Sequence, residues 1–243
     1  MAGMWAMVVP TIPVLASHFQ ISPGTAAQLI TALSVGRFAG MPISGFLLDK
    51  FGARTALIAG PLTACAAAIL AALMPWFTLI LIPVFFIGVA DSIWVIAREI
   101  AGVDLVRADQ RGRVLSGFHG VNYLGLAFGP LLGGLLTERW GFRAVFLAYA
   151  ACAAASVLLG WSVESRQHAG APQRMTDFVQ GWNLAAIKQR LRAIRNLFYQ
   201  IDPQLRGTYI VLVLATFTSF AHRVTTQSIV PVFASTILGM TPK

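Results

Sequence analysis

Two side chains of opposite charge lie inside apolar stretches long enough to cross a membrane: Arg37 in 25–48 and Asp91 in 77–98. Ionisable groups at membrane depth are costly and usually face a cavity or a partner. If both stretches are helices, their rise places Asp91 roughly 10 Å and Arg37 roughly 12 Å from the same membrane edge. The two side chains could therefore meet, either as a structural ion pair or as a site for a proton or a charged ligand.

Polar groups also interrupt the apolar stretch 208–235 near its middle, at His222, Arg223 and Gln227. A lone arginine within a span is weak evidence for a binding site by itself, because its long side chain can also extend to the membrane surface. Asn122, in the span 114–136, is a lesser candidate for a binding role. His119 is as consistent with a packing role as with carrying a proton.

The common catalytic and metal-binding patterns are absent from the sequence. It contains no G-x-x-x-x-G-K-S/T loop, no H-E-x-x-H helix and no G-x-S-x-G elbow. Cys65 and Cys152 each stand alone in an apolar stretch, which favours packing over a disulfide or a zinc site. We therefore expect no enzyme activity, no metal and no cofactor.

The composition indicates that lipid is the main solvent of this chain. Of its 243 residues, 57% are hydrophobic and 11% are charged, against about 25% charged in an ordinary soluble domain. The mean hydropathy is +0.72, and apolar stretches of about 20 residues, enough to span a bilayer as helices, recur along the chain. We predict an all-α, multi-pass membrane protein with spans at 1–16, 25–48, 55–74, 77–98, 114–136, 143–163 and 208–235.

The basic residues predict the orientation of these spans. The formal net charge is +9, and Lys and Arg are concentrated in the second, fourth and sixth connections, while the first and third connections contain none. The positive-inside rule then places the even-numbered connections in the cytoplasm. The basic residues form no stripe with interleaved aromatics, so we expect the lipid bilayer as a partner and no nucleic acid.

A short repeat relates the first span to the last. The sequence Pro-Val-Leu-Ala-Ser at 13–17 returns as Pro-Val-Phe-Ala-Ser at 231–235, after six spans. A chance recurrence is the alternative, but the spacing favours two parallel repeats of six helices. We predict a six-helix bundle at 1–163, a cytoplasmic linker with a basic amphipathic helix at 164–207, and the first helix of a second bundle at 208–243. The remaining helices of the second bundle are expected to be missing from this sequence.

The connection after the second span carries a recognisable pattern, formed by Gly45, Asp49, Lys50, Gly52 and Arg54. It resembles the signature between helices 2 and 3 of the major facilitator superfamily, except that Ala53 replaces a second basic residue. Gly45 would let helices approach closely, and Gly52 would permit a tight turn. An ordinary charged turn is the alternative. The resemblance implies that Asp49 pairs with a basic group, for which we expect Arg98.

The fifth span has glycines and a proline at regular spacing: Gly125, Gly129, Pro130, Gly133 and Gly134. This pattern resembles the helix-5 signature of the proton-coupled antiporters of the superfamily. Without any family, the same spacing predicts a ridge of small residues against which another helix packs. In the fourth span, Val84 stands where exporters of the superfamily often have an arginine.

The resemblance implies a secondary transporter that works by alternating access, and we expect a proton-coupled exporter of a small molecule in a bacterial inner membrane. Its partners would be the substrate, protons and the missing bundle. The candidate cavity or coupling residues are Asp91, Arg37, His222, Arg223, Gln227 and Asn122. Uptake of an anionic metabolite is an alternative favoured by the two arginines, and a non-transporting membrane module is another. We also expect the span 208–235 to be the least securely packed.

Overall fold

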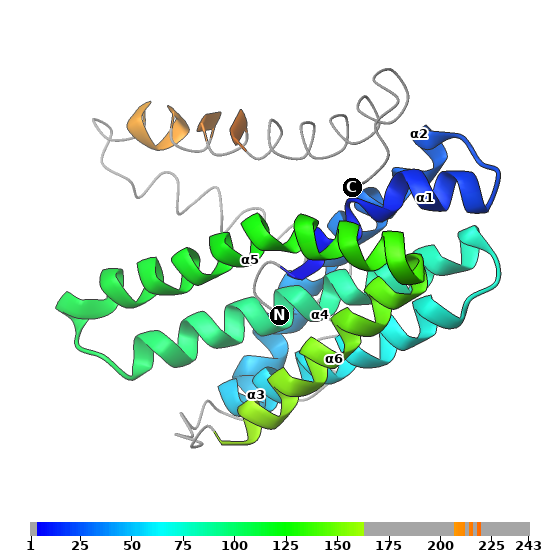
Figure 1. The fold of residues 1–243 in the computed structure, drawn as a ribbon. Helices are drawn as coiled ribbons and strands as arrows, with labels where there is room; N and C mark the ends of the chain where they lie inside the picture. The colour runs from blue at the N-terminus through cyan, green and yellow to red at the C-terminus, as the bar shows by residue number, and fades with distance from the viewer. Residues whose placement is uncertain (1–3, 163–206, 212–213, 216–217, 220–243) are drawn as a thin grey trace, which may run out of the picture. The chain divides into compact units, whose positions relative to one another are not determined.

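The fold was taken from a computed structural model, which describes residues 4–162, 207–211, 214–215 and 218–219 (Figure 1). The described residues are helical, without a strand, as the sequence predicts. The elements of the first part, in chain order, are η1 (Met4–Val8), α1 (Thr11–His18), α2 (Pro23–Ala26), α3 (Gln28–Leu73), α4 (Phe77–Asp104), η2 (Ala108–Gln110), α5 (Arg111–Trp140) and α6 (Phe142–Trp161). Residues 207–211, 214–215 and 218–219 are helical and belong to a separate unit.

Among the described residues, four helices are long and apolar enough to cross a membrane: Gly24–Leu73, Phe77–Asp104, Ala108–Trp140 and Phe142–Trp161. They contain the second to sixth predicted spans, and the first of them holds two spans. The described helix α4 extends six residues beyond the predicted end at residue 98. Asp91 consequently lies near the middle of α4. Most of the predicted linker 164–207, its amphipathic helix and most of the span 208–235 fall outside the described residues.

The second and third spans are joined by a sharp break at Gly52 within α3. Gly52 has φ 77° and ψ 170°, a conformation with positive φ that L side chains rarely adopt. The predicted tight turn at this glycine is therefore confirmed. We call the two halves of α3 the first arm (28–51) and the second arm (53–73). The first arm runs parallel to α4, since Gly36 faces Phe85 and Gly40 faces Val89.

The first span differs from the continuous helix predicted for residues 1–16. It consists of the 3₁₀ helix η1 and the α-helix α1, which ends at His18, with a turn at 9–10 between them. Pro10 precedes α1 and Pro13 lies in its first turn. A proline is favoured in the first turn of a helix, where its missing N–H would have no partner, so the two prolines favour the start of a new helix at Thr11.

Glycines bring the first arm of α3 into backbone contact with α4. A Cβ added to Gly36 would lie 2.0 Å from the backbone oxygen of Phe85, and one added to Gly88 would lie 2.2 Å from that of Leu33. At Gly40 the nearest atom would be the oxygen of Val89, at 2.8 Å. These distances leave no room for a side chain. The spacing of Gly36 and Gly40 is the small-residue pattern that lets membrane helices pack closely, a signal that our sequence analysis did not use.

A second close approach joins α5 to the first span. A Cβ added to Gly133 would lie 2.2 Å from the backbone oxygen of Met7 in η1. Gly129 and Gly134 are buried as well. The packing interpretation of the glycine ridge is thus confirmed at Gly133. The expected close approach at Gly45 is not, because no described atom lies within 4 Å of a Cβ built there.

Arg54, the last residue of the pattern after the second span, ties the third span to the end of α6. Its Nη2 donates a hydrogen bond of 3.1 Å to the backbone oxygen of Trp161. Carbonyl oxygens at the end of a helix lack partners within the helix and carry partial negative charge, so a cation there is stabilising.

We expect Arg54→Gln to lower the free energy of unfolding by no more than about 1 kcal/mol, because Arg54 is exposed and water can replace it. Thermal unfolding in detergent measures the effect. Arg54→Lys is the matched control that keeps the charge, and it should recover part of the loss. A large loss in both variants would contradict a capping role.

Candidate substrate and proton site

Arg37 and Asp91 form an ion pair between the first arm of α3 and α4. Nη2 of Arg37 lies 2.8 Å from Oδ2 of Asp91. Asp91 is 8% exposed, and the Arg37 side chain is 28% exposed. The expectation that the two side chains meet is confirmed. Their pairing alone does not separate a structural role from a functional one, because a salt bridge serves either.

The glycine crossing positions this pair. Arg37 follows Gly36 directly, and Asp91 lies one helical turn beyond Gly88, so the contact of the two backbones brings their side chains together. The hydroxyl of Ser92 adds a cross-helix hydrogen bond of 2.8 Å to the backbone oxygen of Arg37. The backbones that carry the two charged side chains are therefore held close together on both helices.

Trp5 of η1 covers the guanidinium. Cζ of Arg37 lies 4.6 Å from the centroid of the Trp5 ring, in the range of a cation–π contact. Nε of Arg37 is buried and has no hydrogen-bond partner among the described residues. The first span thus contributes to the site through Trp5. The sequence offered no spacing that would have singled out this tryptophan.

Tyr149 brings α6 to the same site. It is 1% exposed, and its hydroxyl has no hydrogen-bond partner within the described part of the chain. Asp91 and Arg37 are both close enough to interact electrostatically with it. Sequence analysis missed Tyr149, since a tyrosine in an apolar stretch is ordinarily a packing residue.

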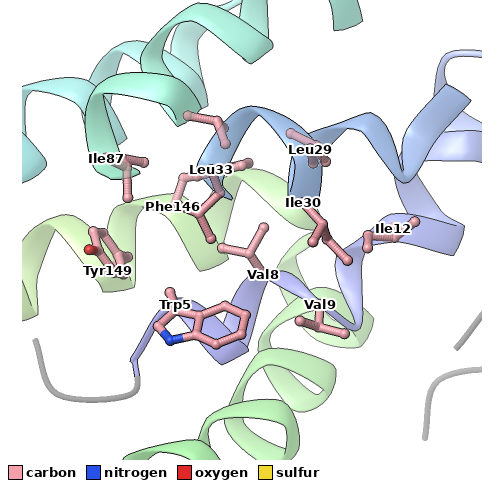
Figure 2. A pocket seen from close by; sticks show the side chains of 11 residues that line it. Trp5, Val8, Val9, Ile12, Leu29, Ile30, Leu33, Ile87, Phe146 and Tyr149 are labelled. Carbon is pink, nitrogen blue, oxygen red and sulfur yellow. The ribbon is translucent and has the colours of Figure 1, made fainter. Parts of the chain in front are cut away.

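A small cavity near the pair lies between η1, α1, α3, α4 and α6. Figure 2 shows Trp5, Val8 and Val9 on one side of it and Phe146 and Tyr149 on another. The tyrosine oxygen points away from the other labelled side chains. The volume is about 20 Å³, enough for roughly one water molecule. Ligand pockets usually measure about 300–1,000 Å³, so this cavity is closed to a substrate in the described conformation.

The other candidate residues are placed less closely. Asn122 is partly exposed on α5. Three of the candidates lie outside the described residues: His222, Arg223 and Gln227. Most of the span 208–235 lies outside them too, so the prediction that it is the least securely packed span stays a prediction. His119 lies 3.9 Å from Glu99, measured from Nε2 to Oε1. Within the described part of the chain, no three His, Cys, Asp or Glu side chains gather as a metal site would require.

The predicted contact between Asp49 and Arg98 is replaced by a different arrangement. Arg98 pairs with Glu99 at 3.7 Å, and its Cζ lies 4.8 Å from the ring of Trp94 and 5.1 Å from that of Phe118. Asp49 is exposed and forms no ion pair with any residue that the structure describes. The two aromatic rings flank the guanidinium, and the Arg98 side chain is largely buried. Lys50 lies over the rings of Phe46 and Phe51.

The family profile described as Major Facilitator Superfamily matches residues 1–243. The chain belongs to this superfamily. Membership agrees with the multi-pass helical fold and indicates a membrane transporter rather than an enzyme. It also accounts for the glycine patterns after the second span and in α5, which had suggested the superfamily from the sequence.

Named members of the superfamily align with part of this chain. The probable transporter AQR1 of Saccharomyces cerevisiae is 28% identical over 153 residues, which cover 60% of this chain and 26% of that protein. The multidrug transporter AQR1 of Candida glabrata is 30% identical, over 59% and 25%. The triacylglyceride transporter of Mycobacteroides abscessus is 29% identical, over 73% and 34%. The alignments thus span between a quarter and about a third of these superfamily relatives.

The fold agrees with a solved structure of the major facilitator superfamily. The proton:xylose symporter XylE, bound to 6-bromo-6-deoxy-D-glucose, aligns with a TM-score of 0.58 over 97% of this chain and 68% of the symporter chain. The sequences are 13% identical. At this identity the comparison supports the fold and carries nothing about the substrate.

Proposed function

We propose that the whole protein is a secondary active transporter that exports a small molecule in exchange for protons by alternating access. The observation that carries this proposal is the Arg37–Asp91 ion pair, with 2.8 Å between its charged atoms, near a small cavity among five elements of the bundle. Placing a carboxylate at membrane depth costs free energy, and a carboxylate there can bind and release a proton. The name of the Candida glabrata relative, a multidrug transporter, supports export.

The geometry suggests how proton binding at Asp91 would change the bundle. The ionised carboxylate holds Arg37, and protonation removes the charge that makes this hydrogen bond strong. Arg37 also stacks on Trp5, so its release loosens the contact of η1 with α3 and α4. Opening the cavity beside Trp5 and Tyr149 would then admit a substrate that the described conformation excludes.

A second candidate function is the uptake of an anionic metabolite together with protons. Nε of Arg37 is buried without a partner in the described residues, so the guanidinium retains a donor for a carboxylate or phosphate. Export by exchange and uptake by symport use the same ion pair. They differ in the direction in which protons move relative to the substrate.

This difference gives the test. We would reconstitute the whole protein into liposomes that contain a pH-sensitive dye and add cationic drugs, neutral drugs and anionic metabolites in turn. Export by exchange predicts that an added substrate moves protons against its own direction, whereas symport predicts movement in the same direction. Liposomes without protein are the control. If the rate of substrate movement did not depend on an imposed pH gradient for any compound, both forms of coupling would be contradicted.

We also infer that the protein resides in the inner membrane of a bacterium. Support comes from bacterial relatives such as that of Mycobacteroides abscessus and from basic residues in the connections assigned to the cytoplasm. Membrane fractionation, with protease access to the connection at residues 105–110, tests this placement. Digestion in intact spheroplasts would contradict the assigned orientation.

A further inference from the structure

A groove lies around Arg98, which the proposed transport cycle does not use. It is formed by the second arm of α3, α4, α5 and α6 and has a volume of about 260 Å³. Its walls are mostly apolar and include Leu57, Trp94, Ala101, Leu105, Phe118 and Leu159. We call it the Arg98 groove. It lies near the end of α4 that precedes Arg107, Arg111 and Arg113, the end assigned to the cytoplasm.

The guanidinium of Arg98 has an N–H donor that no described residue uses. It is held between the rings of Trp94 and Phe118, and its Nε is buried without a partner among the described residues. Its ion pair with Glu99 is long, at 3.7 Å, beyond the distance of a hydrogen bond. The same oxygen of Glu99 also faces His119. Arg98 is therefore preorganised and only partly neutralised.

The rim of the groove is apolar and open. Leu105 is 71% exposed and Leu159 is 72% exposed. Exposed leucines near the end of a membrane span are suited to hydrocarbon chains rather than to water. The groove therefore presents a cation close to exposed leucines at the end of the bundle assigned to the cytoplasm.

We propose that the Arg98 groove binds one anionic phospholipid of the cytoplasmic leaflet, with its phosphate on Arg98 and an acyl chain along the leucines. Basic pockets between membrane helices on the cytoplasmic side are suited to anionic headgroups. Charge complementarity selects the anion, and the apolar walls select a lipid over inorganic phosphate. A free phosphate would leave the exposed side chain of Leu105 facing water.

The test measures retained lipid by native mass spectrometry. The protein is released from nanodiscs of phosphatidylcholine and phosphatidylglycerol in equal amounts. We expect one phosphatidylglycerol to be retained by the wild type and by Arg113→Gln, which removes a charge from the same end outside the groove. Arg98→Gln should bind it about fivefold or more weakly, the factor expected for one basic residue at an anionic surface.

A second variant separates the groove from the charge. Ala101→Phe keeps Arg98 but fills the space for the acyl chain, so it should also lose the lipid. If Arg98→Gln does not fold, lipid retention by Ala101→Phe alone tests the proposal. Added inorganic phosphate at millimolar concentration should not displace the lipid; displacement would show a simple anion site and overturn the lipid assignment. Equal retention of phosphatidylcholine, or unchanged retention in both variants, would overturn the proposal.

Discussion

Asp91→Asn should abolish transport driven by a pH gradient while leaving substrate binding and expression largely intact. Asparagine has nearly the shape of aspartate and can still accept a hydrogen bond from Arg37, but it cannot bind and release a proton. The measurement is substrate accumulation in proteoliposomes under an imposed gradient, compared with equilibrium binding of the same substrate. Asp91→Glu keeps the carboxylate and should retain some coupled transport.

A double variant separates the coupling role from a structural one. Asp91→Asn leaves the charge of Arg37 without an ionised partner, so any loss of stability in this variant has to be separated from the loss of coupling. Arg37→Gln combined with Asp91→Asn replaces the ion pair by a neutral hydrogen-bonded pair of similar size. If the pair is only structural, this variant should fold and transport. If Asp91 carries the proton, the variant should fold without driven transport, and normal flux would refute our assignment.

Gly88→Ala should be strongly damaging, as Gly36→Ala should be, because both glycines lie in the same close crossing of the two backbones. The new Cβ would lie 2.2 Å from the backbone oxygen of Leu33 and 2.9 Å from the backbone nitrogen of Arg37. Because both neighbours are backbone atoms, the first arm of α3 and α4 must separate. We expect a loss of about 1–3 kcal/mol or more in the free energy of unfolding.

Gly45→Ala is the matched control for this loss. It lies on the same arm of α3, and no described atom is within 4 Å of its added Cβ. Alanine is the better helix former, so the control should be neutral or slightly stabilising. Thermal unfolding in detergent compares the two proteins. Equal melting temperatures for the two variants would contradict the close crossing at Gly88.

Much of the fold was predictable because a helix that crosses a bilayer must be predominantly apolar along its length. Apolar stretches of span length, separated by charged or proline-containing connections, identified the second to sixth spans. Gly52 was predictable since only glycine readily occupies its conformation. The first span was not predicted as it is, because the apolar composition of 1–16 outweighed the effect of Pro10 and Pro13 on its continuity.

The site was predictable only where charge made it conspicuous. Arg37 and Asp91 stood out because charge is rare in apolar stretches, and counting helical rise brought them to the same depth. Trp5 and Tyr149 have no such signal, since aromatic residues are common in membrane helices, and only three-dimensional packing brings them to the pair. Arg98 was assigned to the wrong neighbour because sequence indicates charge but not the aromatic rings that compete for it.

The junction at Gly52 also bears on how the protein is made. One residue joins the two arms of α3, with helix on both sides and no intervening loop. During synthesis of the second arm, the short junction at Gly52 prevents the first arm from moving to a different depth in the membrane. Such a junction favours entry of the two arms into the bilayer as a paired hairpin. Asp49, Lys50 and Arg54 then stay on the side of synthesis and never cross the hydrocarbon.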